Sequence, residues 1–472
     1  MPAWLISSII HTLVLVLLSY WSYQRSGSSA IALQAQQSDQ ASQAITFQVA
    51  QTNVQQDNIS EAQAEQPIAV DIAPQQTAQL SVTPIPKSTV LTKDQHAMVT
   101  NGGSPTEMHL LMLPGGGLEG RSPEGRKEFG ERFGATPESE QAVDLALQWL
   151  INHQRPNGSW SFNLDLDPCN GRCRHSKKAG DTPTPSTGAT GLALLALLGA
   201  GHTHKTGPYA DNIRDAIYYL RSVAGETQFG LDWQHGSMYG HGIALMALGE
   251  ACSMTADKDG NYDSDLHNLV TRGSVFTASA QHSNGSWGYV PGRPGDTTLT
   301  GWQVLSLIAV RRNGISLPSP TLPNAKKFIR TIVATDEFEF GYQSPEPETT
   351  TTAIGLTLML YLGQRPGMTL FDESLDRLAN RGPTLTNVYH DYYGSLALHH
   401  AQHKGWERWN NKLRDHLVRT QATEGHEIGS WHFKDKWGDK GGRLYTTCMS
   451  AMMLEIYYRY LPLYDPDAKF PL

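Results

Sequence analysis

A short corner element recurs along this chain and constrains its fold more than any other feature. It reads QRPNGSW at 154–160, QHSNGSW at 281–287 and QATEGHEIGSW at 421–431. An amphipathic segment precedes each glutamine, and an apolar segment follows each tryptophan. A glycine can take the left-handed backbone that ends a helix, and a tryptophan offers a large face for packing. Each copy therefore predicts two helices joined by a tight corner, with these structural residues: Gln154, Gly158, Trp160, Gln281, Gly285, Trp287, Gln421, Gly429 and Trp431.

Looser copies lie between these three corners. The apolar segments carry small anchor residues that are separated by 51, 59, 54, 40 and 55 positions, namely Gly191, Gly242, Gly301, Gly355, Ser395 and Ser450. A recurrence of about 50 residues indicates a repeat architecture. Each unit consists of an amphipathic outer helix, a corner and a more apolar inner helix.

Six such helix pairs can close into a ring, with buried inner helices and half-exposed outer helices. Closure also protects the terminal repeats, which an open solenoid must cap separately. The sequence therefore predicts an all-α domain, an α/α toroid of about six helix hairpins. An open α-solenoid is the alternative.

The Q-x(3)-G-S-W element resembles the QW repeat of squalene-hopene and oxidosqualene cyclases. The predicted ring resembles the α/α toroid that those cyclases share with protein prenyltransferase β subunits. This resemblance covers about residues 136–465. The layout resembles still more closely a group of membrane-anchored planctomycetal proteins with prenyltransferase/squalene-oxidase repeats, through the phrases SMYGHGIALMALGEACSMTAD (237–257), EIGSWHF (427–433) and GGRLYTTCMSAMMLEIYYRYLPLY (441–464).

The resemblance implies a catalytic zinc set in prenyltransferases, with Asp and Cys in D-x-C and a His in a Y-H-T-C-like run. This chain keeps Asp296 and Tyr445, but Thr298 stands at the cysteine position and Thr446 at the histidine position. Threonine hydroxyls are poor zinc ligands. The cyclase motif D-x-D-D is also absent. We therefore expect neither zinc-dependent prenyl transfer nor squalene cyclisation, and leave open whether the protein is an enzyme.

Three segments are predicted along the chain. Residues 1–25 form a transmembrane anchor, because the run WLISSIIHTLVLVLLSY is apolar and long enough to span a bilayer. A cleaved signal peptide is the alternative, but a basic leader and an A-x-A-like site are missing. Residues 26–135 form a disordered linker rich in Gln, Ala, Ser, Gly and Pro. Residues 136–472 form the toroid domain, which the resemblance places outside the cytoplasm on a single-pass membrane anchor.

An insertion in the first repeat carries Cys169 and Cys173 in a C-x(3)-C pair. Three interpretations stay open: a local disulfide, free thiols, or a metal site that adds His175 and a fourth ligand such as His202 or His204. The spacing matches no standard zinc motif, so the sequence predicts no metal and no cofactor. The formal charge of −8 and the lack of basic clusters also argue against a nucleic acid partner.

The predicted N-termini of the inner helices are where a ligand would bind, because in a ring they can point into the central cavity. Their free N–H groups favour anions. The candidate residues there are Asp296, Glu348, Asp391, Arg443 and Tyr445. Plain helix capping is the alternative for each acid.

Three functions remain compatible with these residues. The toroid binds a hydrophobic, isoprenoid or glycan ligand, or a partner, in its central cavity without catalysis. Alternatively, paired carboxylates such as Asp296 with Glu348 or Asp391 perform acid/base chemistry on a glycan or an isoprenoid. In the third, the cavity is filled and the outer face is a protein-interaction scaffold.

Overall fold

The computed structural model describes residues 118–177, 186–234, 237–257, 260–334, 336–435 and 438–463. The predicted anchor at 1–25 and the predicted linker up to residue 117 lie outside these residues. Within the described ranges, no helix combines the length and apolar character that a membrane crossing requires. The anchor therefore stays a prediction.

The described part of the chain is mostly helical, with six hairpins of an outer and an inner helix. The outer helices are α4 (Pro137–Asn152), α6 (Ala210–Ser222), α8 (Ser264–Ser279), α10 (Thr321–Thr331), α12 (Thr369–Arg381) and α14 (Trp406–Thr420). The inner helices are α5 (Ser186–Gly199), α7 (Met238–Ser253), α9 (Thr297–Arg311), α11 (Thr349–Tyr361), α13 (Val388–His400) and α15 (Gly438–Leu454).

The two kinds of helix differ in how much of their surface they bury. The outer helix α6 buries one stripe, at Ile213, Ala216, Ile217 and Leu220. This is the spacing of an amphipathic helix with one face on the core. The inner helix α9 is buried from Thr297 to Val310, on all sides. A helix that is mostly apolar on all sides is stable in water only when other helices surround it. This requirement places such helices in the inner layer and the amphipathic helices in the outer layer.

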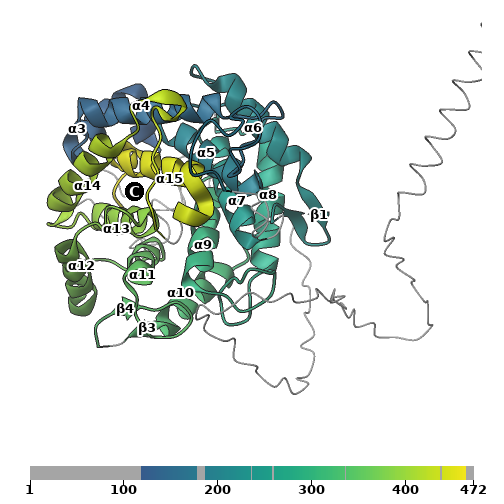
Figure 1. Cartoon of the computed structure of the whole chain (residues 1–472). Coiled ribbons are helices and arrows are strands. Elements are labelled where there is room, and N and C mark those ends of the chain that lie inside the picture. Colours follow the sequence, from purple (N-terminus) through teal and green to yellow (C-terminus); the bar gives the residue numbers. More distant parts are fainter. Residues whose placement is uncertain are drawn as a thin grey trace, which may run out of the picture. The chain divides into compact units, whose positions relative to one another are not determined.

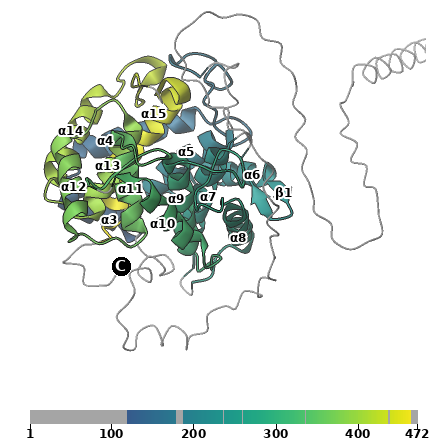
Figure 2. The same ribbon diagram turned by 90° about the horizontal axis from the view of Figure 1, so that it is seen from below.

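The inner helices close into a ring, which Figures 1 and 2 show. Each packs on its neighbours in the order α5, α7, α9, α11, α13, α15, and α15 packs back on α5. The outer helix α14 likewise contacts α4. The α/α toroid prediction is therefore confirmed at the level of a closed helical ring. Close approach is needed between neighbours: a Cβ on Gly191 would lie 2.9 Å from the side chain of Ile243.

The last part of the predicted linker is folded, which corrects the boundary at residue 135. The 3-10 helix η2 (Glu119–Arg121) and helix α3 (Pro123–Phe133) pack on the short helix α16 (Ile456–Arg459). Ser122 caps α3 by accepting from the amide of Gly125 at 3.0 Å. The segment has a low apolar content, so its order comes from tertiary contacts rather than from an apolar period.

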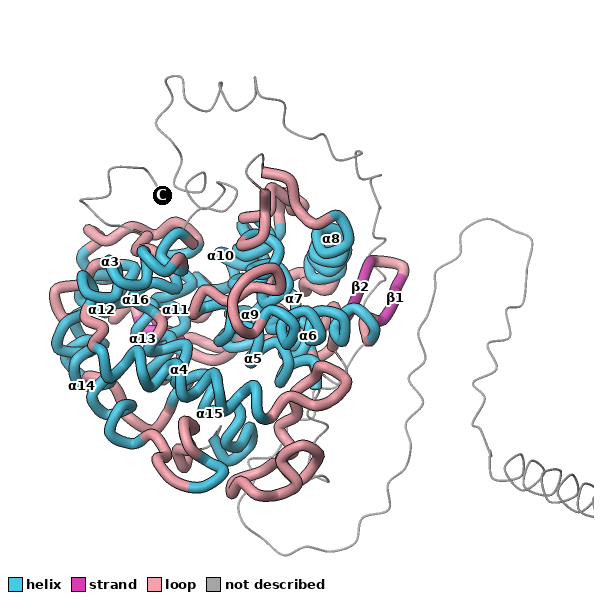
Figure 3. Tube along the Cα trace, turned by 90° about the horizontal axis from the view of Figure 1, so that it is seen from above, coloured by secondary structure: helices cyan, strands magenta, loops and turns pink. Residues whose placement is uncertain are grey.

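Two small antiparallel hairpins interrupt the predicted all-α pattern. Strand β1 (Gly225–Thr227) pairs with β2 (Gly230–Asp232), and β3 (Val333–Ala334) pairs with β4 (Glu339–Phe340). Both connect an outer helix to an inner helix in loose copies of the repeat, and Figure 3 shows β1 and β2 beside α6 and α8. They occupy the position that the Gly-Ser-Trp corner holds in the first, third and sixth repeats.

Candidate functional site

The three Gln–Gly–Trp corners share one set of hydrogen bonds. The Gln281 amide donates to the carbonyls of Gly285 and Thr321, each at 2.9 Å. The Trp287 indole donates to the Thr277 carbonyl at 2.7 Å, and Trp287 is fully buried. Gln154 with Trp160 and Gln421 with Trp431 make the same two kinds of contact.

Each corner also binds its repeat to the next outer helix. Gln281 reaches Thr321 at the start of α10, and Gln421 reaches the Ala142 carbonyl of α4 at 2.7 Å. Gly429 has a φ of 87°, and a Cβ on it would lie 2.2 Å from the Leu145 carbonyl. The third corner therefore joins the last repeat to the first. We call this junction of α14 and α15 with α4 and α5 the seam.

Asp296 is a fully buried helix cap whose two carboxylate oxygens are both occupied. Its Oδ1 accepts from the amides of Thr298 and Leu299 at 2.8 and 2.9 Å and from the Thr298 hydroxyl at 2.5 Å. Its Oδ2 accepts from the Tyr342 hydroxyl at 2.7 Å. This is the capping role that the sequence left open beside catalysis.

Two hydroxyl chains converge on Asp296. The Thr298 hydroxyl donates to Asp296, so at 2.5 Å it accepts from the Tyr239 hydroxyl. The Tyr342 hydroxyl likewise donates to Asp296 and accepts from Tyr289, 3.5 Å away. Burial, together with Tyr289 and Asp296, raises the pKa of Tyr342, so the phenol stays a donor at neutral pH.

Tyr239, Tyr289 and Tyr342 form a partly exposed group, here called the tyrosine cluster. The rings of Tyr239 and Tyr289 meet edge to face with centroids 5.7 Å apart. Tyr289 is 49% exposed, and the other two are partly buried. Tyr239 is the second residue of α7, Tyr289 lies in the loop before α9, and Tyr342 lies in the loop before α11.

The other predicted carboxylates, Asp391 and Glu348, have different surroundings. Asp391 accepts from the amides of Thr384 and Leu385, each at 2.8 Å, and pairs with His390 at 2.9 Å. Glu348 is exposed at the start of α11, and its side chain makes no capping hydrogen bond. The hydrogen-bond partners of Asp296 are Thr298, Leu299 and Tyr342, and they include neither of these acids.

Aromatic side chains cross the interior of the ring beneath the tyrosine cluster. Tyr389 of α13 reaches α9, where its hydroxyl lies 3.4 Å from the Thr298 carbonyl. Tyr393 of α13 meets Trp302 of α9 edge to face at 6.4 Å between ring centroids. Both tyrosines are buried. They reach α9 from α13 even though α11 lies between these two helices along the ring. Side chains of α13 and α9 therefore bridge the interior of the ring at this level.

The opposite end of the ring is held by a buried ion network. Glu250 of α7 accepts from Arg121 at 2.8 Å and from Arg459 at 3.2 Å, and Glu455 pairs with Arg459 at 2.9 Å. Desolvation would raise the pKa of Glu250, but the two arginines outweigh it and hold that pKa at about 2. For Glu455 desolvation wins over Arg459, and its pKa rises to about 7.

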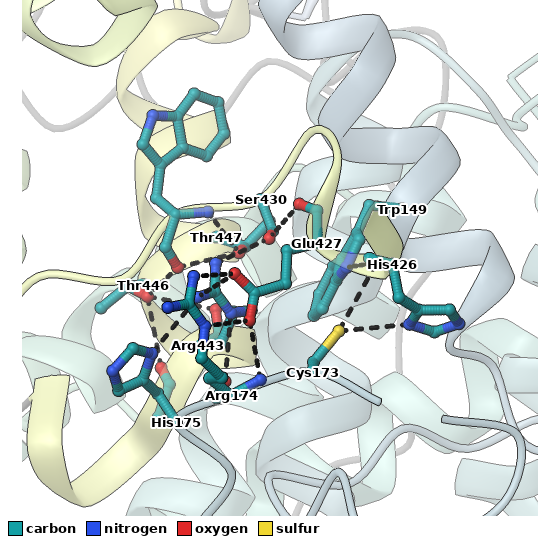
Figure 4. A network of polar contacts seen from close by, with 12 residues as sticks. Trp149, Cys173, Arg174, His175, His426, Glu427, Ser430, Arg443, Thr446 and Thr447 are labelled. Atoms are coloured by element: carbon teal, nitrogen blue, oxygen red, sulfur yellow. Dashed lines mark hydrogen bonds and ion pairs between the residues drawn. The ribbon is translucent and has the colours of Figure 1, made fainter. Parts of the chain in front are cut away.

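Arg443 and Tyr445 lie near the start of α15, where Gly442 breaks the helix with a φ of 64°. Arg443 bonds Glu427 at 2.9 Å and the Ser430 hydroxyl at 3.0 Å, and Arg174 bonds the same carboxylate at 3.0 Å (Figure 4). Arg443 therefore belongs to a polar network at the seam with Glu427, Ser430 and Arg174. Tyr445 is instead partly buried against the core.

The structure brings Cys169 and Cys173 together with two histidines that the sequence did not single out. His153 at the end of α4 and His426 in the 3-10 helix η3 (Gly425–Glu427) place their ring nitrogens with the two thiols, all within 4.8 Å of one another. Desolvation lowers the pKa of His153 to about 4, so its imidazole is uncharged at neutral pH. All four cysteines are free.

The histidines named beside these cysteines in the sequence lie elsewhere. His175 stacks on His432 with ring centroids 3.8 Å apart, and its Nδ1 lies 3.2 Å from Arg443. His202 packs edge-on against Tyr209.

Comparison with known proteins identifies no family for this chain. No family model and no curated protein sequence matches the chain. Similar solved structures include an α-1,6-mannanase of Salegentibacter sp. HEL1_6 in an inactive variant with α-1,6-mannotriose (13% identity, 68% of this chain, 99% of that chain, TM-score 0.47). A type II terpene cyclase variant from Scytonema with geranylgeranyl dihydroxybenzoate has 11% identity, covers 68% and 97%, and has a TM-score of 0.46. A novel α-amylase from Clostridium perfringens has 10% identity, covers 67% and 97%, and has a TM-score of 0.45.

Proposed function

We propose that this toroid is a non-catalytic binding domain that takes a polyhydroxylated ligand, of saccharide type, at the tyrosine cluster. The ligand would bind at the N-terminal ends of α7 and α9 rather than in the centre of the ring. In the predicted chain organisation, the anchor at residues 1–25 would hold this domain at a membrane.

One observation carries the proposal: Asp296 is fully buried, caps α9 and holds two tyrosine-terminated hydroxyl chains in place. It accepts four hydrogen bonds, three at Oδ1 and one at Oδ2. A general acid or base needs a carboxyl group free to exchange a proton with the substrate. Asp296 is instead a positioning residue for Tyr239 and Tyr342.

The outer tyrosines of the two chains, the exposed Tyr289 and the partly buried Tyr239, have the chemistry that suits a sugar. The Tyr239 and Tyr289 hydroxyls donate inward, so their lone pairs can accept from ligand hydroxyls. Their rings provide apolar faces on which the C–H face of a sugar ring can lie. A purely apolar isoprenoid would offer no donor to the remaining lone pairs of these two hydroxyls, which disfavours it relative to a sugar.

Titration of the full chain with defined probes tests this proposal. Mannohexaose, cellohexaose and chitohexaose serve as saccharide probes, and farnesyl diphosphate serves as the isoprenoid probe. We expect saturable calorimetric binding of at least one hexasaccharide, weakened at least tenfold by Tyr289→Ala. The control Tyr218→Ala removes a tyrosine that is 57% exposed on α6, and it should leave the affinity unchanged.

Three outcomes would contradict the proposal. Binding of farnesyl diphosphate alone would make the saccharide class wrong. Binding that survives Tyr289→Ala would place the site elsewhere on the toroid. Appearance of cleaved oligosaccharides by mass spectrometry, abolished in Asp296→Asn, would favour the carboxylate enzyme instead.

A further inference from the structure

Four donor atoms of metal-binding type meet at the seam, and they come from opposite ends of the toroid sequence. The Cys173 Sγ lies 3.3 Å from His153 Nε2 and 3.3 Å from His426 Nδ1. The Cys169 Sγ lies 3.9 Å from His426 Nδ1. His153, Cys169 and Cys173 belong to the first repeat, and His426 belongs to the last.

These separations fit the edges of a zinc tetrahedron. Zinc–sulfur bonds of about 2.3 Å and zinc–nitrogen bonds of about 2.0–2.1 Å place neighbouring S and N ligands about 3.6 Å apart. The observed S···N distances of 3.3, 3.3 and 3.9 Å scatter around that value. We propose that His153, Cys169, Cys173 and His426 bind one zinc ion, and that this ion closes the seam of the toroid.

The surroundings of His153 support a ligand role. Its Nδ1 lies 2.7 Å from the Trp149 carbonyl, so Nδ1 carries the hydrogen and Nε2 presents its lone pair toward Cys173. Metal-bound histidines almost always use the second ring nitrogen in this way. Trp149 also stacks on the His153 ring and donates to the His426 carbonyl at 3.2 Å. One tryptophan thus contacts both histidine ligands.

The donor set indicates zinc in a structural role. Two thiolates and two imidazoles in tetrahedral array are typical of structural zinc sites, and they leave no open position for a substrate. His153, Cys169 and Cys173 are 4%, 1% and 4% exposed, which keeps the site largely dry. A Cys169–Cys173 disulfide would satisfy the sulfurs but would leave His153 Nε2 and His426 Nδ1 directed at an inert bridge.

The proposed ion lies beside a polar network that joins the same two loops. Glu427 follows His426, and it accepts from the Arg174 amide at 2.7 Å and from the Arg443 guanidinium at 2.9 Å (Figure 4). Arg174 follows Cys173 directly in the sequence. The insertion of the first repeat and the corner of the last repeat are thus joined twice in succession, once through the ion and once through Glu427.

Metal content of the purified full chain is the first test. We expect about one zinc per chain by elemental mass spectrometry after extensive dialysis, and loss of that zinc in Cys173→Ser and in His426→Asn. Two matched controls should keep the metal: Cys252→Ser changes a buried thiol on α7, and His175→Asn changes a histidine of the neighbouring network. Zinc-free wild-type protein with Cys169 and Cys173 oxidised would overturn the proposal, as would full zinc retention in both ligand variants.

Two measurements on the wild-type protein do not depend on whether the variants fold. Replacement of zinc by Co²⁺ should give the visible absorption bands of a tetrahedral site with sulfur-to-cobalt charge transfer. Octahedral spectra without charge transfer would contradict thiolate ligation. Chelation should raise amide hydrogen exchange at residues 153–177 and 421–433 before it does so in α9 and α11. Exchange that does not change with chelation would show that the ion, if present, does not hold the seam.

Discussion

Replacement of Arg121 by methionine tests how strongly the buried ion network around Glu250 binds residues 118–133 to the ring. The Arg121 side chain is 1% exposed and donates to Glu250 at 2.8 Å and to the Arg459 carbonyl at 2.9 Å. Arg121→Met removes both bonds at similar side-chain length and leaves Glu250 with Arg459 and Tyr460 as its described partners. Leaving a buried charge uncompensated costs about 3–5 kcal/mol, and because Arg459 still pairs with Glu250 we expect a smaller loss, of about 2–3 kcal/mol.

Urea unfolding of the full chain, followed by far-ultraviolet circular dichroism, measures this cost. The matched control is Arg221→Met, because Arg221 forms an ion pair with Asp265 at 2.8 Å in which both side chains are more than half exposed. Exposed pairs contribute about 0–1 kcal/mol, so the control should unfold close to the wild type. If the free energies of unfolding of Arg121→Met and Arg221→Met differed by less than about 1 kcal/mol, the buried ion network around Glu250 would not be what holds residues 118–133 on the ring.

Three further predictions follow from the corners and from the buried acids. Trp287→Ala should cost about 3–5 kcal/mol in thermal or urea unfolding, because it truncates a fully buried aromatic; wild-type stability would contradict the corner role. Asp296→Ala should cost about 1–2 kcal/mol as a lost helix cap, whereas Asp296→Asn keeps one side-chain oxygen for the cap and loses only the acceptor for the Tyr342 hydroxyl, so it should cost less; equal losses in both variants would show that the cap is not the cause. The raised pKa of Glu455, about 7, means that the folded chain keeps a proton that the unfolded chain loses above its ordinary pKa near 4.5. Stability should therefore fall as pH rises from 5 to 8, and Glu455→Gln should flatten that fall, whereas Glu407→Gln, at an exposed site on α14, should not.

Much of the ring could be predicted from the sequence because its determinants are local. The seven residues from Gln281 to Trp287 are enough to predict where one helix ends and how the next one packs. The inner segment from Leu299 to Val310 is apolar on all faces, and such a helix must be surrounded by others. Neither inference needs knowledge of residues far away in the chain.

Helix α3 and strands β3 and β4 could not be predicted in the same way. The segment before the toroid has no apolar period, and its order depends on Arg121 reaching Glu250, which lies 129 residues away. In the fourth repeat, Phe340 takes the place of a corner tryptophan, and its amide donates to Thr352 at 3.0 Å. The corresponding Trp287 amide donates to Thr300, so the contact is kept while the sequence signature is lost.

Beside the tyrosine cluster, the sequence predicted that Asp296 lies at a helix start but could not decide between a helix-capping role and a catalytic one. That choice depends on whether other groups occupy the carboxylate oxygens. Two of the four bonds come from the adjacent amides of Thr298 and Leu299, as any cap would make them. The decisive one comes from Tyr342, 46 residues away in the loop of another repeat.

The metal ligands could have been found by combining two facts that the sequence does contain. The predicted ring places the first repeat beside the last, so a ligand missing from the first can come from the last. The two repeats depart from the common pattern in complementary ways: the first carries the insertion with Cys169 and Cys173, and the third corner has four extra residues between Gln421 and Gly429. This longer corner contains η3, whose middle residue is His426.

The location of both departures has a physical reason. Every other neighbouring pair of repeats is joined by a short connection, so its contacts form with a small loss of chain entropy. The seam joins segments about 280 residues apart, as the bond from Gln421 to Ala142 shows, and the entropy lost on closing a loop grows with its length. Additional contacts are therefore most useful there. The Glu427 network and the proposed zinc ion both lie at that junction, where an otherwise uniform ring would open first.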